Sequence, residues 1–318
     1  MWTRSGLAFT ARTKQRQTLR RWILFALCSL CAVARRQPRS ARRTDIRSAL
    51  KSCANFEVGF EAPTETGPKV FPNYITDVMG LVDHTFILSL SGCETRVPRS
   101  LANRSTCILG ELLDSCAPSE FTTGPYKHAL KVSFMHAVVL DRARSSGFRH
   151  AMLIEDDITL HRRKFSQEFS TDFQHLLDSH AWSIIRFGFR PFFLQSEGAS
   201  RCSTVCRCLI GRFGAHLCRL RRSGCDLRSS DFYVIKSDTF LHLRDRILDR
   251  QQPTTRRIVD LHPMRSVGNQ WLVLPQVSSQ RVLDIPTDYQ IGLGAAYVHK
   301  CAGPRPLPDL LLQQTSSY

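Results

Sequence analysis

The residues best suited to chemistry in this sequence are three consecutive acids, Glu155, Asp156 and Asp157, which follow the short apolar run 151–154. Like charges at such close range repel each other, and burying them is costly unless something neutralises them. A divalent cation does so, because Mg²⁺ and Mn²⁺ prefer carboxylate oxygens and leave positions open for phosphate. The cluster therefore predicts a metal site. The alternative is a solvated acidic turn.

A metal at this position has an evident use. It can bridge the diphosphate of a nucleotide-sugar and stabilise the charge that develops as the nucleoside diphosphate leaves. Strand-end carboxylates beside a core favour such a role over an incidental turn.

A helix, a turn and a strand are expected to hold the acidic cluster in place. Between residues 126 and 144 apolar side chains recur at helical spacing, and Gly147 is expected to end that helix. The apolar run 151–154 then predicts a strand whose carboxyl end carries the three acids. This order is typical of an α/β sheet, in which ligand sites gather at the carboxyl ends of the strands.

Similar patterns predict the rest of an α/β domain. Strands are expected at 84–90, 181–189, 231–236 and 270–274, and helices at 165–177 and 239–248. Composition divides the chain into a basic leader (1–44), a stem or linker (45–80), the α/β domain (81–301) with a Cys-rich insertion (200–228), and a loose tail (302–318).

The charge is concentrated at the N-terminus. The 318 residues carry a net charge of +17, but residues 1–44 hold eleven Lys and Arg and no Asp or Glu, which leaves +6 for the rest. A charge confined to a leader indicates targeting or membrane topology and argues against nucleic acid as a partner. The mildly basic body suits a site for anionic nucleotide phosphates.

The leader contains the apolar run 22–34, which is 13 residues long. A full bilayer span needs about 20 residues. The run therefore predicts either a cleaved signal peptide or a short signal anchor, and both place the body in the secretory pathway. An Arg-rich, acid-free leader is also compatible with an organelle transit peptide.

The sequence has twelve cysteines, of which Cys28 and Cys31 lie in the apolar run. The ten that remain are an even number, which suits disulfide pairing in an oxidising compartment. Five of them cluster in the insertion, at Cys202, Cys206, Cys208, Cys218 and Cys225. Their spacing lacks the paired C-x₂-C arrangement of zinc sites, so disulfides are expected, with zinc as the alternative.

Several segments together resemble the lipopolysaccharide and procollagen galactosyltransferase-type family. The strongest is KVSFMHAVVLDRARSSGFRHAMLIEDDITL (131–160), in which a helix with a serine and a histidine precedes a strand ending in Glu-Asp-Asp. Weaker matches are HTFILSLSGCETR, AWSIIRFGF, SSDFYVIKSDTFLHL, IVDLH and WLVLPQVSSQ. The sequence departs from the family pattern at Ser133, three residues before His136, and at Ser89, where asparagine is usual. The insertion has no counterpart that we can place.

The resemblance implies a GT-A-like (Rossmann-like) nucleotide-sugar-binding domain with Mn²⁺ or Mg²⁺ and a UDP-sugar as cofactors. Asp156 and Asp157 would be the metal ligands, with Asp157 also at the catalytic centre. Glu155 and Asp156 would contact the donor. Asp260 would be the catalytic base or an orienting group near the acceptor. The remaining donor-site candidates are His136 and Arg96, each of which also fits an ordinary structural role.

The expected function is therefore transfer of a sugar, with galactose as the guess from the family, to a glycan or protein hydroxyl. The expected location is the lumen of the endoplasmic reticulum or Golgi, with possible membrane attachment through the N-terminal segment. Two alternatives remain open: a non-catalytic relative that binds glycans, and a secreted, disulfide-rich interaction protein whose acidic triplet is incidental.

Secretory targeting has a direct test at the sequon Asn103-Arg104-Ser105. Glycosidase treatment of the expressed chain should lower its mass on a gel, and Asn103→Gln should abolish that shift. An unglycosylated protein recovered from mitochondria or plastids would contradict the expected location.

Overall fold

The computed structural model describes residues 46, 48–53, 60–61, 69–93, 95–160, 165–188, 190–191, 208–221, 227–228, 230–260, 262–274 and 277–280. All the elements named below belong to one compact unit, Ser48–Tyr318. The apolar run 22–34 and the tail 302–318 lie outside the described residues. Within the residues described, no helix has the length and apolar character needed to cross a membrane.

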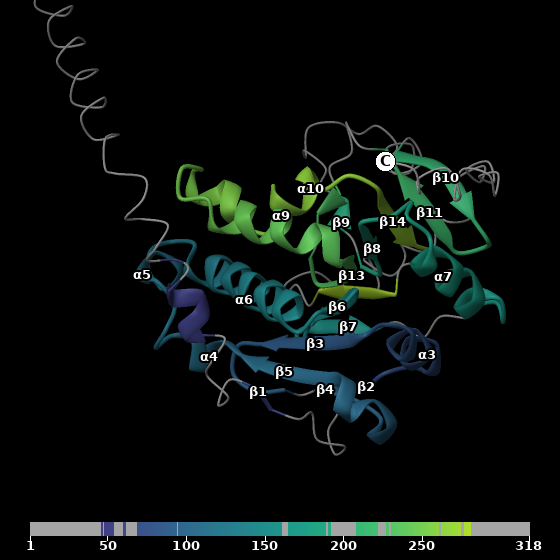
Figure 1. Cartoon of the computed structure of the whole chain (residues 1–318), viewed down its shortest axis with the longest axis horizontal. Coiled ribbons are helices and arrows are strands. Elements are labelled where there is room, and N and C mark those ends of the chain that lie inside the picture. The colour runs from purple at the N-terminus through teal and green to yellow at the C-terminus, as the bar shows by residue number, and fades with distance from the viewer. Residues whose placement is uncertain are drawn as a thin grey trace, which may run out of the picture. The chain divides into compact units, whose positions relative to one another are not determined.

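A nine-stranded mixed sheet forms the centre of the unit (Figure 1). Its strand order is β1 (Phe60–Glu61), β5 (Ser105–Leu109), β3 (His84–Ser89), β6 (His150–Glu155), β13 (Phe232–Lys236), β8 (Ile184–Arg186), β14 (Gln270–Val273), β11 (Leu217–Leu220) and β10 (Leu209–Phe213). Strands β5, β3 and β6 are parallel. Strand β13 is antiparallel to both β6 and β8, whereas β14 is parallel to β8. The predicted α/β class is confirmed.

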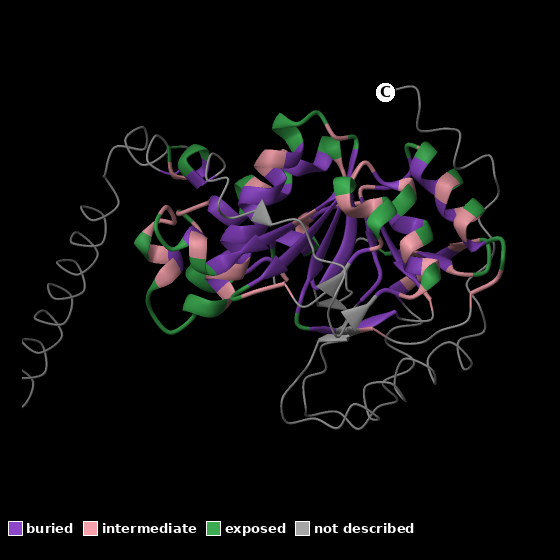
Figure 2. Cartoon of the chain, turned by 90° about the horizontal axis from the view of Figure 1, so that it is seen from below, coloured by how far each residue is buried: buried purple, intermediate pink, exposed green. Residues whose placement is uncertain are grey.

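The central strands are buried (Figure 2), and their side chains are mostly apolar on both faces, as is usual for strands covered by helices. One face packs against α3 (Asn73–Leu81) and α7 (Phe169–Asp178) in a large apolar cluster. This cluster takes Met152 and Ile154 from β6 and Phe232 and Val234 from β13, which are alternate residues of each strand. The opposite face is covered by two longer helices.

These two helices are α6 (Lys127–Ser145) and α9 (Ser237–Leu248), which lie side by side in Figure 1. The end of α6 follows from its sequence. Gly147 has a φ of 72°, and its N–H donates to the carbonyl of Arg144. The N–H of Phe148 donates to the carbonyl of Ala143, which completes the hydrogen-bond pair of a glycine C-cap. The chain then turns directly into β6, as predicted.

Short elements complete the unit. Pairs of short strands form at β2 (Lys69–Val70) with β4 (Thr95–Arg96), β7 (Ile158–Leu160) with β15 (Ser278–Gln280), and β9 (Arg190–Pro191) with β12 (Leu227–Arg228). The short helices are η2 (Arg99–Arg104), α4 (Gly110–Leu113), α5 (Ser119–Thr122), η3 (Thr254–Arg257) and α10 (Pro263–Ser266). The predicted glycosylation residue Asn103 is exposed in η2.

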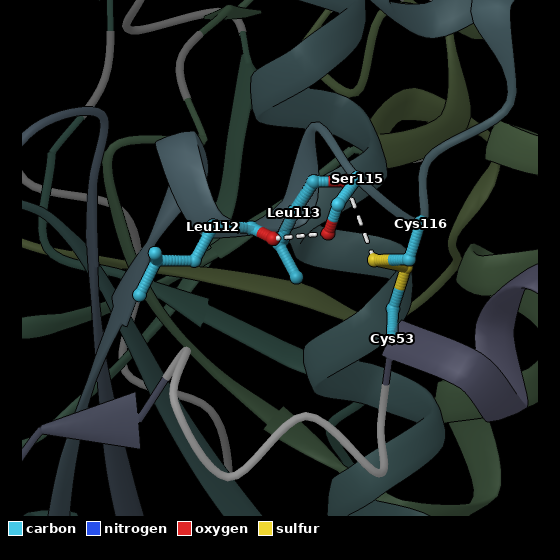
Figure 3. The surroundings of a disulfide bond; sticks show 5 residues. All are labelled: Cys53, Leu112, Leu113, Ser115 and Cys116. Atoms are coloured by element: carbon cyan, nitrogen blue, oxygen red, sulfur yellow. Dashed lines mark hydrogen bonds between the residues drawn. A yellow bond between two sulfur atoms is a disulfide. The ribbon is translucent and has the colours of Figure 1, made fainter.

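The predicted stem, 45–80, is partly folded into the domain. Helix α3 buries Ile75, Val78 and Met79 in the apolar cluster. Upstream of it, Cys53 forms a disulfide with Cys116, just after α4 (Figure 3). Helix α3 is thus part of the packed α/β unit, although it precedes residue 81, where the domain was expected to begin.

The Cys-rich insertion contains regular structure in residues 209–220. Strands β10 and β11 pair as a hairpin, and β11 extends the main sheet through β14. Cys208 is disulfide-bonded, whereas Cys218 is a free, buried thiol, which corrects the expected pairing of Cys218. Cys202, Cys206 and Cys225 lie outside the described residues. Elsewhere, Cys93 is bonded to Cys107.

The two kinds of cysteine predict a labelling pattern. Burial raises the pKa of Cys218 to about 11, so its reactive thiolate is scarce at neutral pH and the thiol is also shielded. Iodoacetamide should therefore label Cys218 slowly in the native protein and fully in guanidinium without reductant. Mass spectrometry should find Cys53, Cys116 and Cys208 unlabelled in both states. Rapid native labelling of Cys218 would contradict its buried position.

Candidate functional site

The acidic triplet lies where β6 ends, between β3 and β13. The N–H of Glu155 donates to the carbonyl of Asp231 at 2.7 Å, and the N–H of Asp156 donates to the carbonyl of Leu88 at 2.8 Å. Glu155 is 8% exposed and Asp156 is 5% exposed, whereas Asp157 is exposed to solvent. The turn is thus anchored on both sides by backbone hydrogen bonds, and it presents Asp157 outward.

Strand register explains which side chains share a face with Glu155. Glu155 pairs with Leu88, whereas Tyr233 pairs with both Leu153 and Arg186. Because side chains alternate along a strand, Glu155, Tyr233 and Arg186 all lie on the face opposite the apolar cluster. That face is covered by α6 and α9, so these polar groups are buried under helices.

Glu155 is held there by a chain of buried hydrogen bonds. Its Oε1 accepts from Ser230 Oγ at 3.0 Å and lies 3.2 Å from His136 Nε2, while His136 Nδ1 lies 2.8 Å from the hydroxyl of Tyr233. With Glu155 ionised, the consistent arrangement has Nε2–H donating to Glu155 and Tyr233 donating to Nδ1. Burial and the charge of Glu155 raise the pKa of Tyr233 well above its usual range, which keeps its hydroxyl proton in place.

A second buried charge lies beside this chain. The Arg186 side chain is only 1% exposed. Burial lowers its pKa to about 10, against the opposing effects of the carboxylates of Asp231 and Asp260, so the guanidinium stays charged at neutral pH. The carboxylate of Asp231 also lies against Gly188, where a β-carbon would come within 3.0 Å of its Oδ2. A larger residue at position 188 would first clash with Ser278 Oγ, which would lie 2.3 Å from the added β-carbon, and would also press on this carboxylate.

Helix α6 also fixes the segment that carries Asp260. Ser133 Oγ donates to the carbonyl of Ala129 at 2.7 Å and accepts from the N–H of Val259 at 2.9 Å. Asp260 follows directly, half-buried between η3 and α10. Ser133 and His136 are one helical turn apart, so a single helix face positions both Asp260 and Glu155.

Most of the predicted site residues come together at this sheet edge. Glu155, Asp156 and Asp157 are consecutive, His136 contacts Glu155, and Asp260 is electrostatically coupled to Arg186. Arg96 is in β4, where its backbone pairs with Val70, and its side chain lies outside what the structure describes.

Sequence reasoning missed four polar residues of the site: Arg186, Ser230, Asp231 and Tyr233. Their signal was present but unused, since Arg186 interrupts an apolar strand and Ser230-Asp231 opens another. A polar residue in an otherwise buried strand needs a partner, and that need was a reason to group them with the acidic triplet.

The carboxylates at this edge suit a hard divalent cation. In the described part of the chain, no group of three or more His, Cys, Asp or Glu side chains is placed to hold a metal ion. Mg²⁺ at phosphate-binding sites takes one or two carboxylates and completes its shell with substrate oxygens and water. Asp156 and Asp157 fit that donor set, whereas Oε1 of Glu155 is already engaged by His136 and Ser230.

Comparison of the chain with protein-family models and with curated proteins gives no match.

The buried hydrogen bonds that join Glu155, His136 and Tyr233 should contribute to the stability of the fold. Tyr233→Phe keeps the ring but removes the donor to His136, which leaves a buried nitrogen without this partner. The free energy of unfolding should fall by about 1–3 kcal/mol, measured by urea denaturation. Tyr126→Phe, at a 46% exposed tyrosine that precedes α6, should change it by less than about 0.5 kcal/mol. If both substitutions changed the free energy of unfolding equally, the hydrogen bond between Tyr233 and His136 would not contribute as proposed.

Proposed function

We propose that the protein is a metal-dependent glycosyltransferase that uses a nucleotide-sugar donor and acts on a glycan or protein hydroxyl. The observation that carries this proposal is the contrast within the triplet. Glu155 is buried and hydrogen-bonded, while Asp157 is presented to solvent two residues later. A merely solvated turn gives no reason to bury the carboxylates of Glu155 and Asp156 and anchor their backbone to two strands.

In this proposal the acids have separate roles. Asp156 and Asp157 hold Mn²⁺ or Mg²⁺, and the cation supplies neutralisation of the diphosphate charge when it is bound. Glu155 serves as the anchor of the turn, because His136 and Ser230 fix its carboxylate. Catalytic geometry must be held within a fraction of an ångström, and a buried hydrogen-bonded residue next to the ligands supports such precision.

Asp260 is the proposed base for the acceptor hydroxyl. It is half-buried on a loop whose backbone is held by Ser133, and it lies within the electrostatic reach of Arg186. As a base it would take the proton of the attacking hydroxyl while the nucleoside diphosphate leaves. Asp231 is the other carboxylate near Arg186, but it is almost fully buried, so Asp260 is the better placed of the two.

The remaining features of the proposal come from the sequence. These are the GT-A-like character of the domain, a UDP-sugar donor with galactose as the first sugar to test, Arg96 as a donor contact, and residence in the lumen of the endoplasmic reticulum or Golgi. The observed disulfides suit that compartment.

The decisive experiment is Asp157→Asn, which removes one charge from the site and keeps the side-chain size. A catalytic metal contributes several kcal/mol of transition-state stabilisation, and each 1.36 kcal/mol is tenfold in rate. Metal-dependent hydrolysis or transfer from a panel of UDP-sugars should therefore fall about a hundredfold or more. The apparent affinity for Mn²⁺ should fall in parallel, with the circular dichroism spectrum unchanged.

The matched control is Asp238→Asn, at an exposed acid in the first turn of α9. The control should retain the activity and Mn²⁺ dependence of the native protein. If Asp157→Asn also retains both, the triplet is a solvated turn. A native protein that is inactive on every donor would instead favour a glycan-binding relative without catalysis.

A further inference from the structure

A pocket of about 490 Å³ lies on the other side of the sheet from α6, between α3 and the start of α7. Its described lining residues are Asn73, Tyr74, Asp77, Phe165, Ser166, Gln167, Phe169 and Ser170. The volume is within the range of small-molecule sites in proteins, which is about 300–1,000 Å³. The pocket is part of none of the chemistry assigned above, so its lining has to be explained separately.

The apolar part of the lining is aromatic. The rings of Tyr74 and Phe165 lie 4.7 Å apart between centroids, and those of Phe165 and Phe169 lie 4.5 Å apart. Tyr74 and Phe165 are only partly buried, whereas Phe169 is buried. Partly exposed aromatic rings at a pocket offer an apolar, electron-rich surface. The C–H faces of a saccharide ring are the natural complement of such a surface.

The polar part of the lining consists mostly of uncharged hydrogen-bonding groups. Asn73 and Gln167 carry amides with both donors and acceptors, Ser170 carries a hydroxyl, and Asp77 carries a carboxylate that only accepts. Among the described lining residues one is acidic and none is basic. These groups suit a ligand with several hydroxyl groups, which can donate to Asp77 and exchange hydrogen bonds with the amides.

The pocket is connected to the acidic edge through the core. Tyr74 and Phe165 pack against the same apolar cluster that contains Ile158, the residue after Asp157. Phe165 is also fixed from behind by His216, whose ring centroid lies 4.7 Å away. The Nε2 of His216 accepts from the N–H of Ser166 at 3.0 Å, and its Nδ1 donates to the carbonyl of Leu274 at 2.8 Å. The aromatic wall is thus held in place before any ligand arrives.

We propose that this pocket binds a neutral saccharide ring of the acceptor glycan, with Tyr74 and Phe165 as the stacking surface and Asp77 and Gln167 as hydrogen-bonding groups. The identification of the saccharide as part of the acceptor depends on the proposed function. The proposal that a saccharide binds here is independent of that function, because it rests on the described lining residues alone.

The test uses saturation-transfer difference NMR on the full chain without metal or donor. The probes are methyl β-galactoside, methyl β-glucoside, methyl α-mannoside and methyl N-acetyl-β-glucosaminide. At least one should bind saturably. The double variant Asp77→Ala/Gln167→Ala should weaken that binding about tenfold or more, because it removes hydrogen bonds, one of them to a charged group. Both positions are exposed, so the fold should tolerate the changes.

The matched control is Gln174→Ala/Asp178→Ala, which removes the same two residue types from the far part of α7, where they bond only to each other in the described contacts. It should leave saccharide binding unchanged. No binding of any probe, or equal binding by the native protein and the pocket variant, would overturn the proposal. Displacement of the saccharide by UMP would overturn it too, because the pocket would then belong to the donor nucleotide.

Hydrolysis of UDP-sugars and its dependence on Asp157 are measured in parallel on the same samples. Saccharide binding without hydrolysis would leave this pocket in place and remove the proposed transferase activity. Hydrolysis without saccharide binding would support the proposed transferase activity and overturn the assignment of this pocket.

Discussion

Charged side chains buried between the sheet and α6 must find partners there, and this requirement organises the site. Glu155 is satisfied by His136 and Ser230, and the charge of Arg186 is balanced by Asp231 and Asp260. An uncompensated charge at either place would cost several kcal/mol, a large share of the stability of a typical domain. The partners come from different parts of the chain, so the site forms only when the whole sheet and its covering helices have formed.

Helix α6 is the element that joins these parts. Ser133 and His136 lie one turn apart, and they bond to the segment before Asp260 and to Glu155 respectively. The helix is fixed in turn at its C-terminus by the glycine cap at Gly147, which sets where β6 begins. A shift of α6 along its axis would therefore disturb both carboxylates together. Rigid elements of this kind hold functional groups more precisely than loops do.

The sequence alone predicted the α/β class, the helix before the acidic cluster and the strand beneath it, because apolar spacing and Gly147 act locally. It placed His136 near Glu155 only through a family resemblance, and no local pattern shows that contact. The roles of Tyr233 and Arg186 could not be predicted, since they depend on β13 and β8 being neighbours of β6. Strand order is a long-range property, and short patterns of residues do not encode it.

The reversed direction of β13 has a consequence for how such a protein can diversify. Because β13 runs against β6 and β8, the residues that enter it, Ser230 and Asp231, lie at the edge where those two strands end. The stretch 191–227, with its cysteines and the β10–β11 hairpin, is thus inserted directly upstream of groups that hold the acidic turn. Within this stretch the hairpin belongs to the main sheet through β14, and Leu217 lies in the apolar cluster, so only changes outside the hairpin leave the sheet intact. Length and crosslinking can therefore vary between this hairpin and β13, close to groups that hold the acidic turn, with the central strands unchanged.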